Sequence, residues 1–228
     1  MAVRKVYSMM LAGVLLWLAV VSALGEGALP TCEGMAYIFQ AGTTITGKSA
    51  FPRYLSDFQS QWKRLEPKAA WTEPEETGIL RCIRSDREGC GVAILYVEES
   101  QHVLAVSVYK TFTPDKSRTA RTGLMATARQ MTEALIRLEH EDGAAQVRQQ
   151  RSATNEALRT LLAPLTDPDS LVEAIFSGLR VEATLAGHQA VCELNYDTEA
   201  MTLTASIVVA PTGPLMQASN AGERPGRT

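Results

Sequence analysis

One segment matches the pattern of a phosphate-binding loop. Residues 42–49 read Gly-Thr-Thr-Ile-Thr-Gly-Lys-Ser, which fits G-x-x-x-x-G-K-[ST]. In such a loop, glycines at the positions of Gly42 and Gly47 let backbone N–H groups curl around a phosphate. Lys48 would reach the outer phosphates, and Ser49 would hold Mg²⁺. The pattern therefore predicts nucleotide binding as one alternative function.

Two features of the sequence count against this nucleotide site. The interior of the motif, residues 43–46, is β-branched and lacks the small residues that let the loop wrap around a phosphate. The strands predicted downstream form antiparallel meanders, whereas nucleotide-binding proteins with this loop have a parallel sheet. We therefore keep nucleotide binding only as the alternative to a binding module.

The four cysteines are Cys32, Cys82, Cys90 and Cys192. An even number of cysteines in an exported chain indicates two disulfides. Neither the C-x2-C pairs of a zinc site nor the C-x-x-C motif of a thioredoxin-like centre is present. A turn over residues 85–89 would place Cys82 and Cys90 at nearly matched distances from its centre, so we expect them to pair and to leave Cys32 with Cys192.

The sequence indicates no catalytic residue, no metal ligand and no cofactor. His102, His140 and His188 are far apart in the chain, and no two of them have the spacing of metal ligands. No G-x-S-x-G motif marks a nucleophilic serine. Catalytic groups can nevertheless come from distant positions, so a hydrolase with an unrecognised site is the second alternative.

The first 23 residues have the pattern of an export signal. Arg4 and Lys5 precede an apolar run over residues 6–24, and Val21-Ser22-Ala23 offers a cleavage site. The run is also long enough to serve as an uncleaved membrane anchor. Either form predicts a periplasmic or secreted protein. Arginine outnumbers lysine 16 to 6, which is typical of a GC-rich bacterial genome.

The charge of the chain argues against a nucleic-acid partner. Removal of Arg4 and Lys5 leaves 20 of 22 basic residues against 25 acidic ones, a net charge of −5. A general nucleic-acid binder needs a basic surface. Basic residues recur over residues 116–159, but acidic residues are interspersed among them, which is typical of a solvated helix face.

The first half of the mature chain predicts a helix followed by a meander. A strand is expected at residues 35–40, and β-prone residues follow at 43–46. Leu55, Phe58, Trp62 and Leu65 form one apolar stripe of a helix whose first turn contains Pro52. A loop over 68–77 would then lead to strands at 79–84, 91–97 and 103–112.

A helical region separates this meander from a second one. Apolar residues at helical spacing between Leu124 and Leu138, and again between Val147 and Leu161, predict an antiparallel helical pair over residues 117–163, or else one long bent helix. Ser170 and Glu173 have the spacing of a capping box, which predicts a short helix ending at Gly178. Three strands follow between residues 179 and 211, and the tail, residues 212–228, is expected to be disordered.

The two meanders resemble each other. Leu95, Leu104 and Ser107 match Leu194, Leu203 and Ser206 in pattern. One interpretation is a degenerate repeat of helix plus three strands, over residues 32–114 and 165–211; the other is that alternation alone produces such matches.

Taken together, the patterns predict a single α+β domain over residues 32–211, in which an antiparallel sheet of two three-stranded meanders packs against helices, with a helical pair inserted between the meanders. The predicted function is an exported, disulfide-stabilised, non-enzymatic binding module. We expect another protein or an envelope component as its partner, no nucleic acid, and membrane contact only through an uncleaved N-terminal segment.

Overall fold

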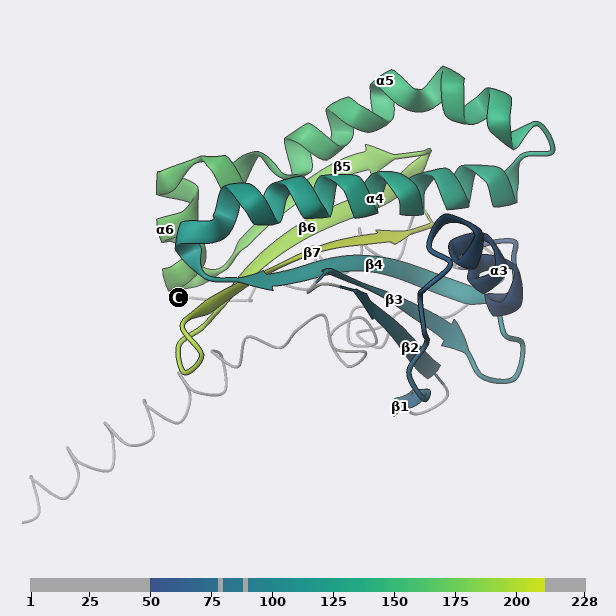
Figure 1. Cartoon of the computed structure of the whole chain (residues 1–228), viewed down its shortest axis with the longest axis horizontal. Helices are drawn as coiled ribbons and strands as arrows, with labels where there is room; N and C mark the ends of the chain where they lie inside the picture. Colours follow the sequence, from purple (N-terminus) through teal and green to yellow (C-terminus); the bar gives the residue numbers. More distant parts are fainter. Residues whose placement is uncertain (1–49, 78–79, 88–89, 212–228) are drawn as a thin grey trace, which may run out of the picture.

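The computed structural model describes residues 50–77, 80–87 and 90–211. They form one seven-stranded antiparallel sheet with the strand order β1-β2-β3-β4-β7-β6-β5. The described helices lie on one side of this sheet (Figure 1). The predicted α+β fold, with an antiparallel sheet packed against helices, is therefore confirmed. The export signal, the strand at 35–40 and the tail at 212–228 lie outside the described residues.

The seven strands are β1 (Glu75–Thr77), β2 (Leu80–Arg87), β3 (Cys90–Val97), β4 (Val103–Phe112), β5 (Leu179–Leu185), β6 (His188–Asp197) and β7 (Thr202–Ala210). The bounds of β4 agree with the sequence prediction. The predicted turn at 85–89 is wrong, because β2 continues through Arg87 and pairs with Cys90 at the start of β3. The predicted loop at 68–77 also contains β1, which pairs with the start of β2.

The described helices are α3 (Leu55–Leu65), α4 (Ser117–Glu139), α5 (Gly143–Leu161) and α6 (Pro168–Ser177), with short 3-10 turns at Pro114–Lys116 and Ala163–Thr166. Among the described residues, no helix combines the length and the apolar character that crossing a lipid bilayer requires.

The apolar stripe predicted for α3 packs into the core. Phe58 and Trp62 are almost completely buried. The helix begins at Leu55, three residues after Pro52, because the chain before it runs extended beside the start of β4. The Phe51 N–H donates to the Val103 carbonyl at 2.8 Å, and Tyr54 forms a bridge with His102. Backbone pairing with the sheet thus delays the start of the helix.

The inserted helical pair is confirmed, and the single bent helix is not. Helices α4 and α5 are separated by a short turn and pack against each other (Figure 1). The close approach at this turn requires glycine: a Cβ added to Gly143 would lie 2.7 Å from Arg137 Cα. In contrast, a Cβ added to Gly123 of α4 would first meet Lys110 Nζ, at 3.3 Å. The added Cβ at Gly143 would therefore meet backbone, which cannot move away easily, whereas the added Cβ at Gly123 would meet the end of a flexible side chain.

The short helix α6 has a different cap from the one predicted. Asp167 is the N-cap, and its carboxylate accepts hydrogen bonds from the Ser170 backbone N–H at 3.2 Å and from the Ser170 hydroxyl at 2.5 Å. These bonds hold the pKa of Asp167 below its usual value. Ser170 therefore lies inside the first turn, and Asp167, with Pro168 after it, is the residue that begins the helix.

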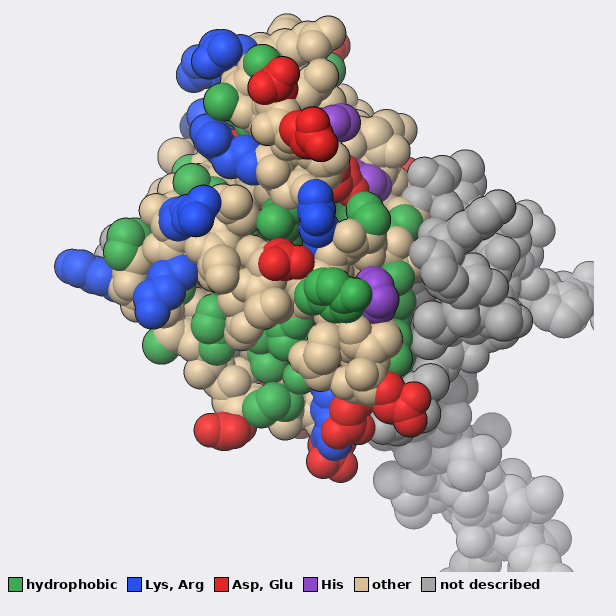
Figure 2. All heavy atoms as spheres, turned by 90° about the vertical axis from the view of Figure 1, so that its right-hand side faces the viewer, with side chains coloured by type: hydrophobic (Ala, Val, Ile, Leu, Met, Phe, Trp, Pro, Cys, Tyr) green, Lys and Arg blue, Asp and Glu red, His purple; other side chains and the backbone are tan. Residues whose placement is uncertain are grey.

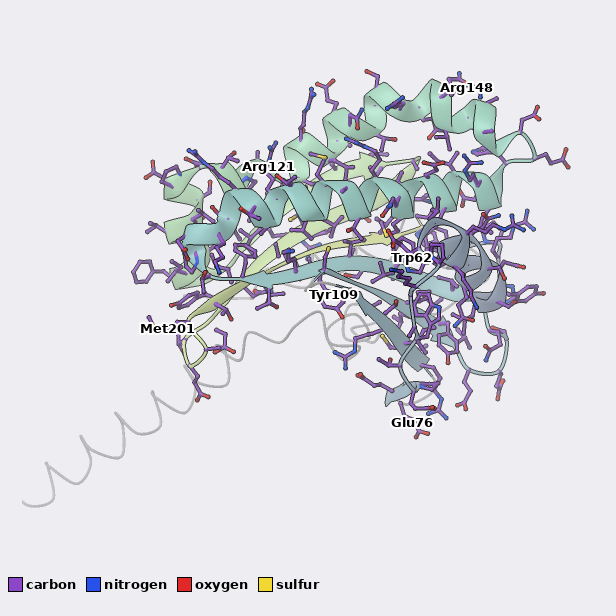
Figure 3. All side chains as sticks on the ribbon, viewed as in Figure 1. Trp62, Glu76, Tyr109, Arg121, Arg148 and Met201 are labelled. Atoms are coloured by element: carbon purple, nitrogen blue, oxygen red, sulfur yellow. The ribbon has the colours of Figure 1, made fainter. Side chains whose placement is uncertain are left out.

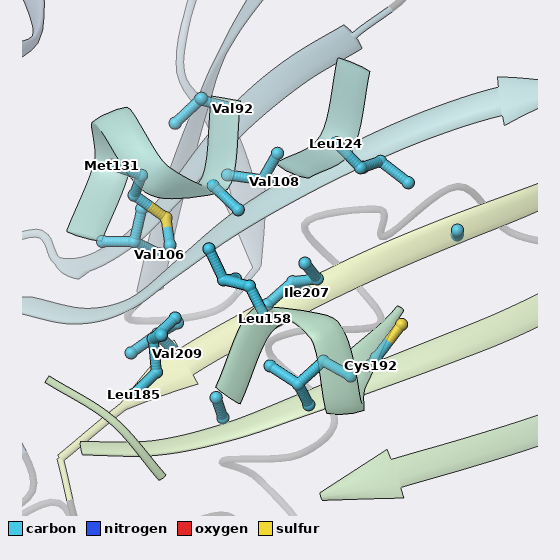
Figure 4. Close-up of a cluster of buried hydrophobic side chains, with 14 of the residues drawn as sticks. Val92, Val106, Val108, Leu124, Met131, Leu158, Leu185, Cys192, Ile207 and Val209 are labelled. Atoms are coloured by element: carbon cyan, nitrogen blue, oxygen red, sulfur yellow. The ribbon is translucent and has the colours of Figure 1, made fainter. Parts of the chain in front are cut away.

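The sheet has two buried faces. The helix-side core contains Leu124 and Met131 of α4, Leu158 of α5 and side chains from the strands beneath them (Figure 4). We call the other side the second face; its buried apolar residues are Leu80, Cys82, Ala93, Leu95, Leu104, Ala105, Tyr109, Val191, Val208 and Ala210. No described helix contributes to this second cluster.

A bulge between β3 and β4 affects the proposed repeat. The register shifts at Leu95/Tyr96, so that Leu95 and Leu104 lie on the second face. Their proposed equivalents, Leu194 and Leu203, belong to the helix-side core. The strand order is nevertheless symmetric about the β4–β7 pair, as a repeat requires. The repeat therefore stays a prediction that rests on topology, because two of its three matched pairs lie on opposite faces.

Both edge strands carry charged side chains. In β1, Glu75 forms an ion pair with Arg84, and Glu76 forms one with Arg81. In β5, Arg180 forms ion pairs with Glu182 at 3.1 Å and with Glu193 at 3.2 Å. The β5 side chains alternate between half-buried and exposed positions up to Leu185.

We expect Gly143→Ala to lower the free energy of unfolding by about 1–3 kcal/mol, because the new methyl group meets the Arg137 backbone. Alanine is a better helix former than glycine by about 1 kcal/mol, so helix propensity alone would predict that Gly143→Ala raises the free energy of unfolding. Gly123→Ala is the matched control and should be neutral or stabilising. Urea unfolding followed by circular dichroism measures both, and equal stability of the two variants would contradict the close contact.

Candidate functional site

The predicted pairing of the cysteines is wrong. Cys82 lies opposite Leu95 on the second face, whereas Cys90 lies opposite Arg87, five residues away along β3, and packs against the helix-side core. Five residues of strand span about 17 Å, and a disulfide needs Cα atoms within about 7 Å. The prediction failed because it centred the turn on residues 85–89, which shifted the register of β2 against β3.

Cys192 does not pair with Cys32 either. Cys90 and Cys192 keep their thiols, so no disulfide joins two described residues. Cys192 is completely buried in the helix-side core (Figure 4), and desolvation, together with the nearby Glu193 carboxylate, raises the pKa of its thiol to about 12. The sulfur of Cys82, in contrast, is disulfide-bonded.

Cys32 lies outside the described residues. The residues of the predicted phosphate-binding loop, Gly42, Gly47, Lys48 and Ser49, also lie outside them, so nucleotide binding stays a prediction.

The described residues form a cleft of about 250 Å³ between α3, α4 and the sheet. We call it the Lys110 cleft; it is lined by Trp62, Glu66, Ala69, Ser85, Cys90, Lys110, Gly123, Ala126, Thr127 and Gln130. Figure 3 shows Trp62 between α3 and the sheet, on the opposite side from Tyr109. The cleft therefore collects residues from two helices and three strands, more than 60 positions apart in the chain.

The sheet register places Cys90 and Lys110 side by side. They are directly opposite each other in the β3–β4 ladder, so both side chains point to the helix side. The Cys90 thiol donates a hydrogen bond to the Thr127 hydroxyl of α4 at 3.3 Å. Lys110 is half-buried and extends beneath Gly123. The thiol of Cys90 therefore lines the cleft on the same face as Lys110.

The cleft contains both donors and acceptors: Trp62 and Lys110 can only donate, whereas the Glu66 carboxylate, which also lines it, can only accept. Trp62 is 4% exposed, and its Nε1–H, which can only donate, has no hydrogen-bond partner in the described part of the chain. Among the described residues, Lys110 forms no ion pair. A buried donor without an acceptor costs about 1–3 kcal/mol. An acceptor atom that enters the cleft would remove this cost and would also meet the positive charge of Lys110.

A second polar contact lies at the other end of α4. His188 Nε2 is 2.8 Å from the Glu139 carboxylate, and both side chains are about 15% exposed. The ring of Phe51 packs edge-on against His188 with the centroids 4.9 Å apart. Glu139 therefore does not belong to a purely solvated helix end, as its neighbours His140 and Glu141 in the sequence would suggest. This contact joins the end of α4 to the start of β6.

The remaining charged groups do not gather into a site. No group of three acidic, histidine or cysteine side chains in the described ranges is arranged to hold a metal ion. On the face shown in Figure 2, basic and acidic side chains are interspersed with uncharged surface. Arg121 and Arg148 lie on the α4 and α5 helices (Figure 3).

No family model, no curated protein and no solved structure matches this chain.

Sequence reasoning did not identify the Lys110 cleft. Trp62 was assigned to the apolar stripe of α3, and Lys110 had no motif around it. The one available signal was the alternation of strand 103–112, in which Lys110 shares a face with Val106 and Val108. A lysine on the helix-facing side of a central strand indicates a polar opening in the core.

We expect Cys90 to react with iodoacetamide in the native protein at pH 8 at least about 100 times faster than Cys192. With a pKa of about 12, only about one in ten thousand Cys192 thiols is ionised at this pH, and the side chain is fully buried. Mass spectrometry of timed digests measures both rates. Unfolding in guanidinium should make the rates similar, and a fast reaction of native Cys192 would contradict the buried position.

Proposed function

We propose that this protein is an exported, non-enzymatic binding module whose ligand site is the Lys110 cleft. The observation that carries the proposal is the buried Trp62 Nε1–H, which has no acceptor among the described residues, in a cleft that the half-buried Lys110 also lines. Both groups are hydrogen-bond donors, and a negatively charged acceptor group on a ligand would bind both of them.

The ligand group that fits this chemistry is a carboxylate on a small apolar body. Ala69, Ala126 and the Trp62 ring supply apolar walls, while Thr127 and Gln130 add polar contacts. A volume of about 250 Å³ is at the small end of ligand pockets. A free organic acid fits these limits, and so does a carboxylate at the end of another protein or on an envelope component.

Two observations support a location outside the cytoplasm. The first 23 residues have the pattern of an export signal. The disulfide at Cys82 is a bond that persists in oxidising compartments and is rare in the cytosol. The proposal of a non-enzymatic role is supported by the composition of the cleft, whose described lining residues include neither a histidine nor an aspartate.

We expect acetate, succinate and benzoate, titrated against the full-length protein, to include at least one ligand that binds ten or more times tighter than its neutral amide. A single charge pair at this depth contributes about 1–4 kcal/mol, which accounts for that ratio. Trp62 fluorescence and isothermal titration calorimetry measure the affinities. Lys110→Met should abolish the preference for the acid over the amide.

Lys116→Met is the matched control, because Lys116 is exposed and lies outside the cleft. It should keep the wild-type preference. An equal loss of the preference for the acid in the Lys110 and Lys116 variants would mean that net charge, and not the cleft, attracts the ligand. Absence of binding by all three acids at 10 mM or below would overturn the proposal.

A further inference from the structure

The second face of the sheet is buried from solvent although no described helix covers it. Its central residues Leu95, Leu104 and Val208 are 0–2% exposed. The described helices all belong to the opposite side (Figure 1). An apolar surface of this size in contact with water would be costly, at about 25 cal/mol per Å². A further part of the protein must therefore lie over it.

Two buried polar atoms indicate that this cover is a peptide chain with its own polar groups. Ser107 lies opposite Ala93, and Gln189 lies opposite Ala210, so both are on the second face. Neither Ser107 Oγ nor Gln189 Oε1 has a hydrogen-bond partner among the residues that the structure describes. Buried polar atoms are nearly always hydrogen-bonded, and backbone N–H and C=O groups from a segment crossing the face are suitable partners.

The described chain begins on this face. Ala50, the first described residue, packs against the second-face cluster, and the chain then passes to the helix side, where Phe51 joins the core. The sequence from Met35 to Gly47 is uncharged and includes the apolar run Met35–Phe39, and Lys48 and Ser49 then lead to Ala50. The segment that enters from the second face therefore has the composition of a buried cover.

The cysteines specify where this segment is attached. Cys82 is disulfide-bonded and lies on the second face, whereas Cys90 and Cys192 keep their thiols on the helix side. Of the four cysteines in the chain, only Cys32 remains as the intramolecular partner of Cys82.

We propose that residues 32–49 cover the second face of the sheet and are attached to it by a Cys32–Cys82 disulfide. The segment is long enough: its 17 steps reach about 58 Å when extended, whereas the four strand spacings from β2 to β6 amount to about 19 Å. The residues Gly42–Ser49 then belong to the cover and reach Ala50 at its edge. In this arrangement their glycines and threonines serve packing and turning, not phosphate binding.

Digestion of the alkylated, non-reduced protein tests the attachment. Trypsin cuts after Arg81, Arg84 and Arg87, so each cysteine lies on its own peptide. We expect the peptide 82–84 to be linked to the peptide that ends at Lys48, and Cys90 and Cys192 to be alkylated after unfolding. An alkylated Cys82, or Cys82 linked to Cys90 or Cys192, would overturn the proposal.

Hydrogen–deuterium exchange tests the cover itself. Peptic peptides from residues 35–48 should exchange at least about 100 times more slowly than an unstructured peptide in the oxidised protein, and faster in Cys32→Ser. Exchange at the unstructured rate in the oxidised wild type would show that another partner covers the face.

Thermal unfolding with and without reductant completes the test. A disulfide that closes a loop of 50 positions should make the melting temperature of the wild type fall by about 10 °C on reduction. Cys32→Ser, which leaves Cys82 in place, should melt at the same temperature with and without reductant. Cys90→Ser is the matched control and should respond to reductant as the wild type does; an insensitive wild type would count against the attachment.

Discussion

The pairing of β4 with β7 joins the two halves of the molecule. The ladder runs from Val106 opposite Val209 to Phe112 opposite Leu203, and its pair Val108 and Ile207 is completely buried beneath the helices. Without it the described strands would form two separate antiparallel sheets, one of four strands (β1–β4) and one of three (β5–β7). Every helix that packs on the sheet depends on the continuous surface that this ladder creates.

This pairing also has a cost in folding. Val108 and Ile207 are 99 positions apart, so the central ladder closes only after the helical pair and the second meander have been brought together. Contacts at this separation are associated with slow folding, because the loop entropy is lost before the contacts form. The helical pair α4–α5 lies within this loop, and its own contacts are local in sequence.

Much of this architecture follows from the spacing of apolar residues along single helices and strands, which can be read from the sequence. Leu124, Met131 and Leu158 repeat with the helical period and do lie in the core, and the alternation of residues 202–210 gives β7 its two faces. The predictions that failed concern the β2–β3 turn and the cysteine pairs, which depend on how strands pair with each other. Ser85 belongs to β2, where it is buried against the helix side, and not to the predicted turn.

The Lys110 cleft was beyond prediction for the same reason. Cys90, Lys110 and Thr127 come from two strands and a helix, and each looks ordinary within its own segment. Their proximity depends on a register that places Cys90 opposite Lys110 and on the position of α4 above them. A register shift of one residue would turn Lys110 to the second face and remove the cleft.

The charged edges of the sheet limit how copies of this protein can associate. An unprotected edge strand is a template for growth, since its free N–H and C=O groups can pair with another molecule. Here β1 has only three residues and is flanked by the Glu75–Arg84 and Glu76–Arg81 ion pairs, and β5 carries Arg180 and Glu182. A strand from a second copy would have to displace these hydrated charges, which protects the protein from edge-to-edge polymerisation at high local concentration.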